Sequence, residues 1–271
     1  MPLLKYRLTN DVLFKILFSQ VPDFLKRLVA GVLNIRFEDI TQFEVEPAEI
    51  PPEAINDKFL HLDINMVLNG QLINLEIQVA NQKDYLERSL YNWATIFANA
   101  LPAGEKYAEL PRVIVISILD FKQFKSKDYH SVFQVWENSR GELLTDRLAL
   151  HYLELKKLPK GTNRASELEL LLSAFRARTV EDLESMRESA VPNMNEVIDM
   201  YWKVTADTKF REIARLKERA RHDEASALSQ AEQKGEQRAD KKWKRLTAQK
   251  DAEIAKLTAE IARLQATISP A

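Results

Sequence analysis

The chain has 271 residues, 45% of them hydrophobic, and its 39 basic and 40 acidic residues give a formal net charge of −1. This length allows one well-buried domain of about 150 residues plus an appendage, and the near-neutral charge means that any contact with nucleic acid comes from a local patch. The absence of cysteine excludes disulfides, thiolate zinc sites and thiol nucleophiles, and four scattered histidines disfavour a histidine metal cage.

The N-terminal residues, MPLLKYRLTNDVLFK, carry no basic region followed by an apolar stretch and no small-residue cleavage site. Every apolar run is interrupted by charge well before the roughly 20 residues that cross a bilayer. We therefore expect a soluble, cytoplasmic protein without membrane contact.

Helical patterning comes first in the chain, over residues 9–34. Thr9 and Asn10 are cap candidates, Asp11 suits the first turn, and Pro22 restarts the helix. A short strand over residues 40–45 and an extended loop with three prolines, EPAEIPPEAIND, are expected next.

The segment KFLHLDINMVLNGQLINLEIQ, residues 58–78, predicts a β-hairpin, because two alternating apolar and polar runs flank Asn69-Gly70. If these two residues form the centre of a type I′ turn, Leu68 pairs with Gln71 and Asp63 lies opposite Glu76. One face of the hairpin then carries only polar side chains: His61, Asp63, Asn65, Asn74, Glu76 and Gln78.

A helix over residues 81–101 and a strand over residues 113–119 are expected after the hairpin. Asn81 and Asp84 occupy capping positions of that helix, whose predicted apolar stripe consists of Leu86, Leu90, Trp93, Phe97 and Leu101. The strand is apolar on both faces, as expected of an interior strand reached by a right-handed crossover. Two further strands, over residues 130–136 and 148–155, either extend the sheet or form a side hairpin.

Residues 165–268 look almost wholly helical, with Thr179 as a cap. Near the end, apolar residues alternate by three and four, as in the seam of a coiled coil: Ile254, Leu257, Ile261, Leu264 and Ile268. We expect homo-oligomerisation through this helix, and the alternative is a long helix packed on its own domain. The expected divisions are an α/β domain at 1–160, a helical extension at 161–208 and a long helix or coiled coil at 209–271.

Directly opposed carboxylates on a hairpin are unfavourable, because like charges lie about 5 Å apart. A divalent cation between Asp63 and Glu76 removes that repulsion, and oxygen ligands of this kind suit Mg²⁺ or Mn²⁺. Such an ion can activate water for phosphodiester cleavage. The alternative is a half-exposed amphipathic hairpin whose solvated face carries these two acids without a function.

At these residues the chain resembles the Rpn family, recombination-promoting nucleases also described as putative transposases, within the PD-(D/E)XK nuclease superfamily. The resemblance covers about residues 8–158 in five segments: LTNDVLFKILF, LDINMVLNGQLINLEIQ, ERSLYNWATIFANAL, GEKYAELPRVIVISIL and HYLELKKLP. It implies an α/β, restriction-endonuclease-like α-β-β-β-α-β core with a mixed central sheet, followed here by an all-α tail ending in a coiled coil. It also implies metal-dependent cleavage of DNA.

Carried over by position, Asp63 resembles the metal-binding aspartate of the second core strand and Glu76 the acidic residue of the third. Gln78 stands where the superfamily usually has a catalytic lysine. A glutamine can only orient the attacking water or offer its carbonyl to the metal. Lys58 is a candidate for the displaced positive charge, although its parity places it on the opposite strand face.

Three helix residues complete the candidate set. Asp11 resembles the family's N-terminal helix acid, or it merely complements the helix dipole. Arg88 and Tyr91 match the helix after the third strand, where a guanidinium and a phenol could hold phosphate. In the alternative interpretation, Arg88 simply neutralises a neighbouring acid.

The first functional hypothesis is a Mg²⁺-dependent endodeoxyribonuclease of low sequence specificity whose strand breaks promote recombination or transfer of a mobile element. The alternative is a catalytically weak, nuclease-like DNA-binding or scaffold protein that its coiled coil assembles. A third hypothesis, transposition by transesterification, rests only on the family's second name.

Overall fold

A computed structural model describes residues 1–46, 63–81, 84–159 and 165–268. The chain divides into two compact units, Met1–Arg215 and Leu216–Ala271. The first unit contains a mixed sheet with helices on both faces, which confirms the α/β class expected from the sequence.

Two helices begin the first unit, α1 (Asp11–Gln20) and α2 (Pro22–Leu33). Asn10 is the N-cap of α1, and its Oδ1 accepts a hydrogen bond from the Leu13 N–H at 3.0 Å. Pro22 stands at the first position of α2, where its fixed φ suits a helix and its missing N–H costs nothing. Both boundary predictions are confirmed.

The sheet has six strands in the order β1-β2-β3-β4-β6-β5. Strands β3, β4 and β6 are parallel, and the other neighbours are antiparallel. Strands β5 and β6 form an antiparallel hairpin, and β6 also pairs with β4, so this hairpin extends the sheet. The sequence analysis had given a side hairpin and an extension of the sheet as alternatives, and the structure combines them. The bounds are β1 Phe43–Val45, β2 Ile64–Leu68, β3 Gln71–Gln78, β4 Val113–Leu119, β5 His130–Glu137 and β6 Glu142–Glu154.

The β2–β3 hairpin has the predicted register, from Leu68 opposite Gln71 to Ile64 opposite Leu75. Asn69 and Gly70 both have positive φ, 47° and 74°, as a type I′ turn requires. The Asn69 side chain also accepts hydrogen bonds from the backbone N–H groups of the two residues before β1, at 2.9 and 3.0 Å. The predicted positions of Lys58 and His61 lie outside the described residues.

Replacing Gly70 with alanine is expected to destabilise the first unit by about 1–2 kcal/mol, because a Cβ is unfavourable at a φ of +74°. The space around Gly70 is open, so the cost is conformational and not steric. Urea denaturation followed by circular dichroism measures it. A midpoint equal to that of the wild type would mean that the turn has another conformation.

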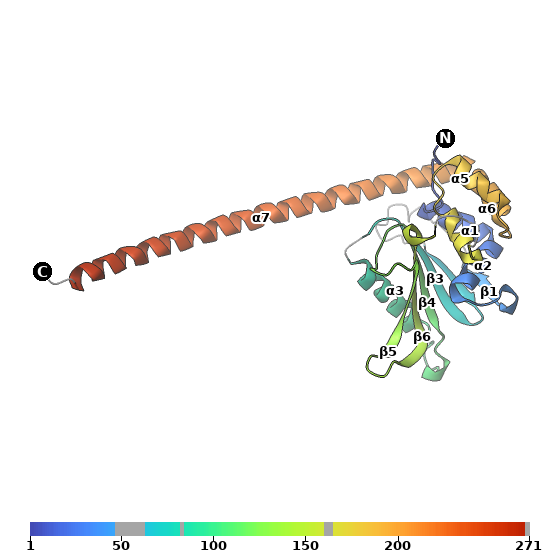
Figure 1. The fold of residues 1–271 in the computed structure, drawn as a ribbon, viewed down its shortest axis with the longest axis horizontal. Helices are drawn as coiled ribbons and strands as arrows, with labels where there is room; N and C mark the ends of the chain where they lie inside the picture. The colour runs from blue at the N-terminus through green and yellow to red at the C-terminus, as the bar shows by residue number, and fades with distance from the viewer. Residues whose placement is uncertain (47–62, 82–83, 160–164, 269–271) are drawn as a thin grey trace. The chain divides into compact units, whose positions relative to one another are not determined.

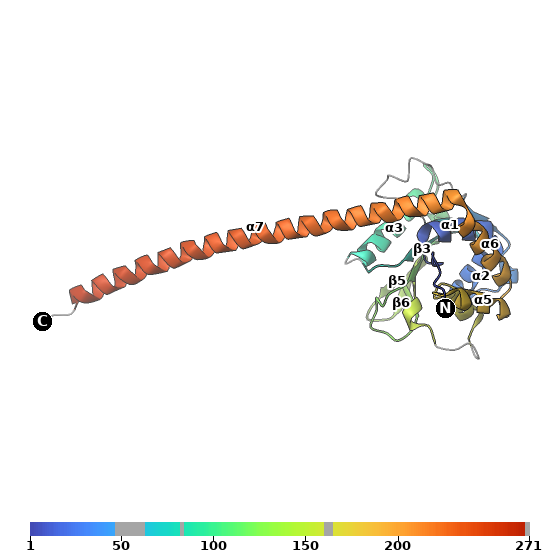
Figure 2. The ribbon, with the colours of Figure 1, turned by 90° about the horizontal axis from the view of Figure 1, so that it is seen from above.

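Helices lie on both faces of the sheet (Figures 1 and 2). The sheet separates two cores, because successive side chains of a strand point to opposite faces. Ile73 and Leu75 of β3 point into the larger core, which α1, α2, α4 (Glu167–Ala174) and α6 (Met194–Ala206) cover. A smaller core lies under α3 (Tyr85–Asn99). The remaining short helices are α5 Val180–Glu184 and the 3₁₀ turns Phe37–Asp39, Tyr107–Glu109, Leu155–Lys157 and Ser185–Glu188.

The face that α3 turns to the sheet differs from the predicted apolar stripe. Leu90 is 50% exposed, whereas Tyr85 and Ser89 are buried. The prediction was therefore wrong for Leu90, because α3 covers a row of polar residues on the sheet and presents hydroxyl groups to it. Asp84 does occupy the N-cap position, but its side chain makes no capping hydrogen bond.

The last helix, α7 (Thr208–Ile268), runs from the first unit into the second. The apolar residues predicted for its seam are more than half exposed at Ile254, Leu257, Ile261 and Leu264. Thr179, the predicted cap earlier in the tail, caps α5 with a reciprocal pair of hydrogen bonds to Asp182. Among the described residues, no helix is both long enough and apolar enough to cross a membrane.

Candidate active site

Glu76 lies near the end of β3, on the face that α3 covers, and its side chain is only 4% exposed. Its Oε1 accepts a hydrogen bond from the Ser117 hydroxyl of β4 at 2.9 Å and a second one from the Tyr85 phenol. Burial and the charge of Glu76 raise the pKa of Tyr85. The phenol therefore keeps its proton and remains a donor to the carboxylate.

Asp63 directly precedes β2, whose first residue Ile64 pairs with Leu75. Continuing this antiparallel register by one residue places Asp63 opposite Glu76, as the sequence predicted. Asn74 connects the two strands here: its Nδ2 donates to Asp63 Oδ2 at 3.4 Å and to Asn65 Oδ1 at 2.8 Å.

The environment of Asp63 disfavours its charge. Burial, and then the neighbouring Glu76 carboxylate, raise the pKa of Asp63 from 3.8 to about 7. The hydrogen bond from Asn74 and the positive charges of Lys15 and Arg88 oppose that rise without cancelling it. Like charges that are desolvated together are the usual condition of carboxylates that share a metal ion.

The donor set fits a hard divalent cation such as Mg²⁺ or Mn²⁺. Within the described ranges, no group of three or more histidine, aspartate or glutamate side chains could enclose a metal. Two carboxylates are nevertheless the protein ligands that Mg²⁺ commonly uses, since it keeps several waters and binds substrate phosphate. The Oδ1 of Asn74, a further hard oxygen, is buried and accepts no hydrogen bond from the described residues.

Gln78 is the last residue of β3, on the same face as Glu76 by strand alternation. Its Nε2 donates to the carbonyl of Ala80 at 3.2 Å, so the amide is held close to its own backbone. This hydrogen bond leaves the side-chain carbonyl as the group that can face a water molecule or a cation.

Arg88 and Tyr91 lie one turn apart on α3 and differ in exposure, Arg88 being half-buried and Tyr91 exposed. The Arg88 guanidinium stands 5.3 Å from the centre of the Tyr85 ring, and its charge lowers the pKa of Asp63. It is thus close enough to act on Asp63, as both interpretations of Arg88 require. The Tyr91 side chain is 71% exposed, and it is not one of the described residues that donate to Glu76.

Asp11 is the first residue of α1, and its Oδ1 accepts from the Val12 N–H at 3.0 Å. This position agrees with a dipole role, and the catalytic role stays a prediction. One turn later, Lys15 is a cation whose charge acts on Asp63. The sequence analysis missed Lys15, although it stands in the segment LTNDVLFKILF that carries the resemblance.

Tyr85 and Ser117 were also missed as site residues. The signal for Ser117 was present, because it is the single polar residue of the buried strand VIVISIL. Tyr85 is the first residue of α3. The predicted apolar stripe of this helix does not include Tyr85, so the sequence pattern offered no reason to expect that its side chain faces the sheet.

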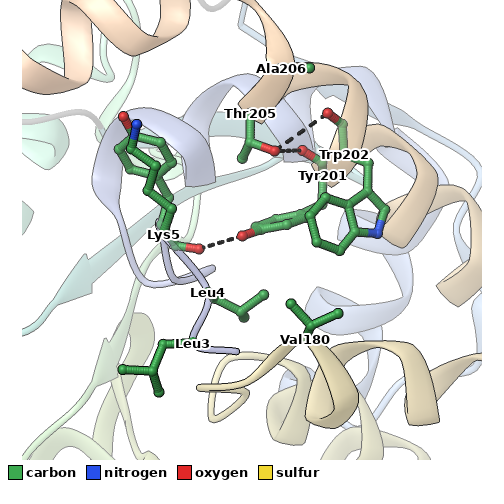
Figure 3. A pocket seen from close by; sticks show the side chains of 9 residues that line it. Leu3, Leu4, Lys5, Val180, Tyr201, Trp202, Thr205 and Ala206 are labelled. Atoms are coloured by element: carbon green, nitrogen blue, oxygen red, sulfur yellow. Dashed lines mark hydrogen bonds between the residues drawn. The ribbon is translucent and has the colours of Figure 1, made fainter. Parts of the chain in front are cut away.

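A separate cavity of about 320 Å³ lies between the N-terminal segment, α5 and α6 (Figure 3). Its lining includes Leu3, Lys5 and Trp202, and Tyr201 closes it with a hydrogen bond to the carbonyl of Tyr6 at 2.8 Å. Among the described residues that line it, there is no carboxylate and no predicted site residue. We therefore assign the candidate chemistry to the Asp63–Glu76 pair.

Comparison with known proteins agrees with the fold. A search of curated proteins and a search of solved structures each returned no match. A family model described as PD-(D/E)XK nuclease family transposase matches residues 8–231. The resemblance noted in the sequence ended at about residue 158, whereas this match continues through α4, α5, α6 and the first part of α7. Because it spans most of the chain, this protein belongs to the family of PD-(D/E)XK nuclease transposases.

Proposed function

We propose that this protein is an endodeoxyribonuclease that requires Mg²⁺ or Mn²⁺ and cuts DNA with low sequence specificity in the cytoplasm. Its strand breaks would promote recombination or the transfer of a mobile element. The observation that supports this function best is the pair formed by the partly buried Asp63 and the buried Glu76, which lie opposite each other on one hairpin of a chain that belongs to a nuclease family.

In this proposal Asp63 and Glu76 would hold the cation, and the cation would stabilise developing negative charge and make a water molecule more acidic. Gln78 orients the attacking water through its carbonyl oxygen. Arg88, whose charge acts on Asp63, binds a phosphate oxygen of the DNA strand. The protein groups thus position the phosphodiester and the water, and none of them needs to act as a strong base.

A plasmid-nicking assay on the full chain, with Mg²⁺, Mn²⁺ and Ca²⁺ in parallel, tests the proposed activity. Conversion of supercoiled to open circular DNA with Mg²⁺ or Mn²⁺ is the expected result. DNA binding without hydrolysis under all three ions would support the alternative, a nuclease-like scaffold protein. A joined strand-transfer product would instead support transposition by transesterification.

We also propose that the second unit pairs with a second copy of the chain as a parallel, two-stranded coiled coil. Ile254 and Ile261 occupy a positions and Leu257 and Leu264 occupy d positions, the combination that favours parallel dimers. All four side chains are exposed in the single chain. The g-position residues Glu253 and Glu260 would face each other in an antiparallel pair, which repulsion disfavours. A dimer would bring two active sites to two DNA strands.

Ile261→Lys is expected to convert a dimer to a monomer, because it places a charge in the middle of the seam. Ala262→Lys adds the same charge one residue later, on the outer face of the helix, and is expected to leave the dimer intact. Sedimentation velocity at several protein concentrations distinguishes the two variants. A wild-type chain that sediments as a monomer would contradict the proposal, as would an Ile261→Lys variant that remains dimeric.

A further inference from the structure

Behind Glu76, a row of buried polar side chains crosses three neighbouring strands at one level of the sheet. Glu76 of β3 is the register partner of Ser117 in β4, and Ser117 is the partner of Tyr152 in β6. All three side chains are at most 4% exposed. Burying a polar side chain costs free energy unless it is hydrogen-bonded, and an apolar residue in place of Ser117 or Tyr152 would avoid that cost. The polar row therefore needs an explanation other than core packing.

Helix α3 completes this row with two further hydroxyl groups. The Tyr85 phenol donates to Glu76 Oε1, and the Ser89 hydroxyl, one turn later, lies 2.6 Å from the Tyr152 phenol oxygen. Ser89 also donates to the carbonyl of Leu86 at 2.9 Å, so its one proton is used there and Tyr152 is the donor to Ser89. The row therefore contains two separate links between α3 and the sheet, of which only one reaches the carboxylate.

Both hydrogen bonds to Glu76 end on the same oxygen. Ser117 and Tyr85 approach Oε1 from different elements, one from the sheet and one from the helix. Among the described residues, none donates a hydrogen bond to Oε2. Two donors on one oxygen fix the rotation of the carboxylate, and the other oxygen is left to accept a cation.

We propose that Tyr85 and Ser117 are positioning residues, which hold Glu76 by Oε1 so that it offers Oε2 to the divalent cation shared with Asp63. This inference deepens the proposed nuclease function and rests on it. Neither residue touches the DNA or the reacting atoms, so each acts only through the carboxylate. In wild-type protein the carboxylate would then be preorganised before the metal binds, which lowers the cost of binding.

Tyr85→Phe and Ser117→Ala test the role, and Tyr152→Phe is the matched control. Tyr85→Phe keeps the ring beneath Arg88 and removes only the donor to Glu76. Tyr152→Phe removes the hydroxyl of another buried tyrosine that is hydrogen-bonded across to α3, but its partner is Ser89 and not the acid. The two tyrosine variants should lose similar amounts of stability and differ only in their effect on the metal.

The measurement is the dissociation constant of Mn²⁺ for the full chain, from titration calorimetry, together with the Mg²⁺ dependence of plasmid nicking. We expect Tyr85→Phe to weaken Mn²⁺ binding about tenfold and Ser117→Ala about threefold, with the nicking rate at saturating Mg²⁺ lowered by less. Tyr152→Phe should bind Mn²⁺ as the wild type does.

Unchanged Mn²⁺ affinity in Tyr85→Phe would overturn the inference, and so would an equal loss of affinity in Tyr152→Phe, which would indicate a merely structural network. If the wild-type chain neither binds Mn²⁺ nor nicks DNA, the proposed function fails and this inference fails with it. If the wild type does both and only the variants disagree, the positioning role alone is wrong.

Discussion

Asp63→Asn is expected to abolish metal-dependent DNA cleavage and, at the same time, to make the metal-free protein more stable at pH 8. The loss of cleavage follows because an amide is a poor substitute for a carboxylate ligand, and we expect a decrease of about 10³-fold or more, roughly 4 kcal/mol of transition-state stabilisation. The gain in stability follows because the substitution removes a desolvated charge that lies opposite Glu76.

The pH dependence of this gain is determined by the pKa of Asp63. In the unfolded chain the carboxyl ionises near pH 4, and in the folded protein its pKa is about 7. The folded state therefore holds an extra proton between these values, and its stability falls as the pH rises from about 4 to 7. Above pH 7 the penalty is complete, whereas below pH 4 it is absent.

Thermal unfolding of the metal-free wild type and of Asp63→Asn at pH 5 and pH 8 measures this difference. We expect the variant to gain about 1–3 kcal/mol more at pH 8 than at pH 5, seen as a rise of several degrees in Tm. Glu44→Gln, which removes an exposed acid from neighbouring β1, serves as the charge control and should change neither stability nor cleavage. Equal Tm values for Asp63→Asn and wild type at both pH values would mean that the ionised Asp63 carboxylate does not destabilise the folded protein.

The same pKa predicts how cleavage by the wild type responds to pH. Since the cation must displace a proton from Asp63 below about pH 7, metal affinity should fall about tenfold for each pH unit below that value. Nicking at subsaturating Mg²⁺ should fall in parallel, and saturating Mg²⁺ should restore much of it. Cleavage that is insensitive to pH between 5 and 7 at low Mg²⁺ would contradict this assignment.

Glu76→Gln is expected to abolish cleavage by a similar factor while the fold remains intact. Glutamine has nearly the same shape, and its carbonyl oxygen can still accept the hydrogen bonds from Tyr85 and Ser117. Glu76→Ala should also be inactive, but it leaves two buried hydroxyl groups without their acceptor. We therefore expect it to be about 2 kcal/mol less stable than Glu76→Gln.

Circular dichroism, urea denaturation and plasmid nicking on the purified variants separate the chemical role of Glu76 from its structural role. The informative comparison is an inactive Glu76→Gln with a wild-type spectrum, since misfolding cannot explain it. Nicking at the wild-type rate by a purified variant with both Asp63 and Glu76 replaced would exclude this site altogether.

The hairpin that holds these acids was predictable from the sequence for local physical reasons. Asn69 and Gly70 are residues that adopt positive φ, and the alternation on either side of them allows one register that buries the apolar face. The two carboxylates are therefore paired by a turn of two residues and by strand parity. Neither depends on contacts from distant parts of the chain.

The surroundings of the pair were decided by tertiary structure. Tyr85, Ser117 and Lys15 reach the acids from α3, β4 and α1, elements whose relative placement no local pattern specifies. The relative placement of α3 and the sheet also explains why α3 packs on a row of polar residues and leaves Leu90 exposed. Helical periodicity identifies an amphipathic helix but does not say which surface it will cover.

The sequence alone thus determined the class of fold, the hairpin register and the opposition of Asp63 and Glu76, because turn chemistry and side-chain alternation act over a few residues. Tertiary structure alone decided that Glu76 is buried, that two hydroxyl groups hold its Oε1, and that the pKa of Asp63 rises to about 7. Burial and the electrostatic field are sums over groups far apart in the chain, and only the folded arrangement brings those groups together.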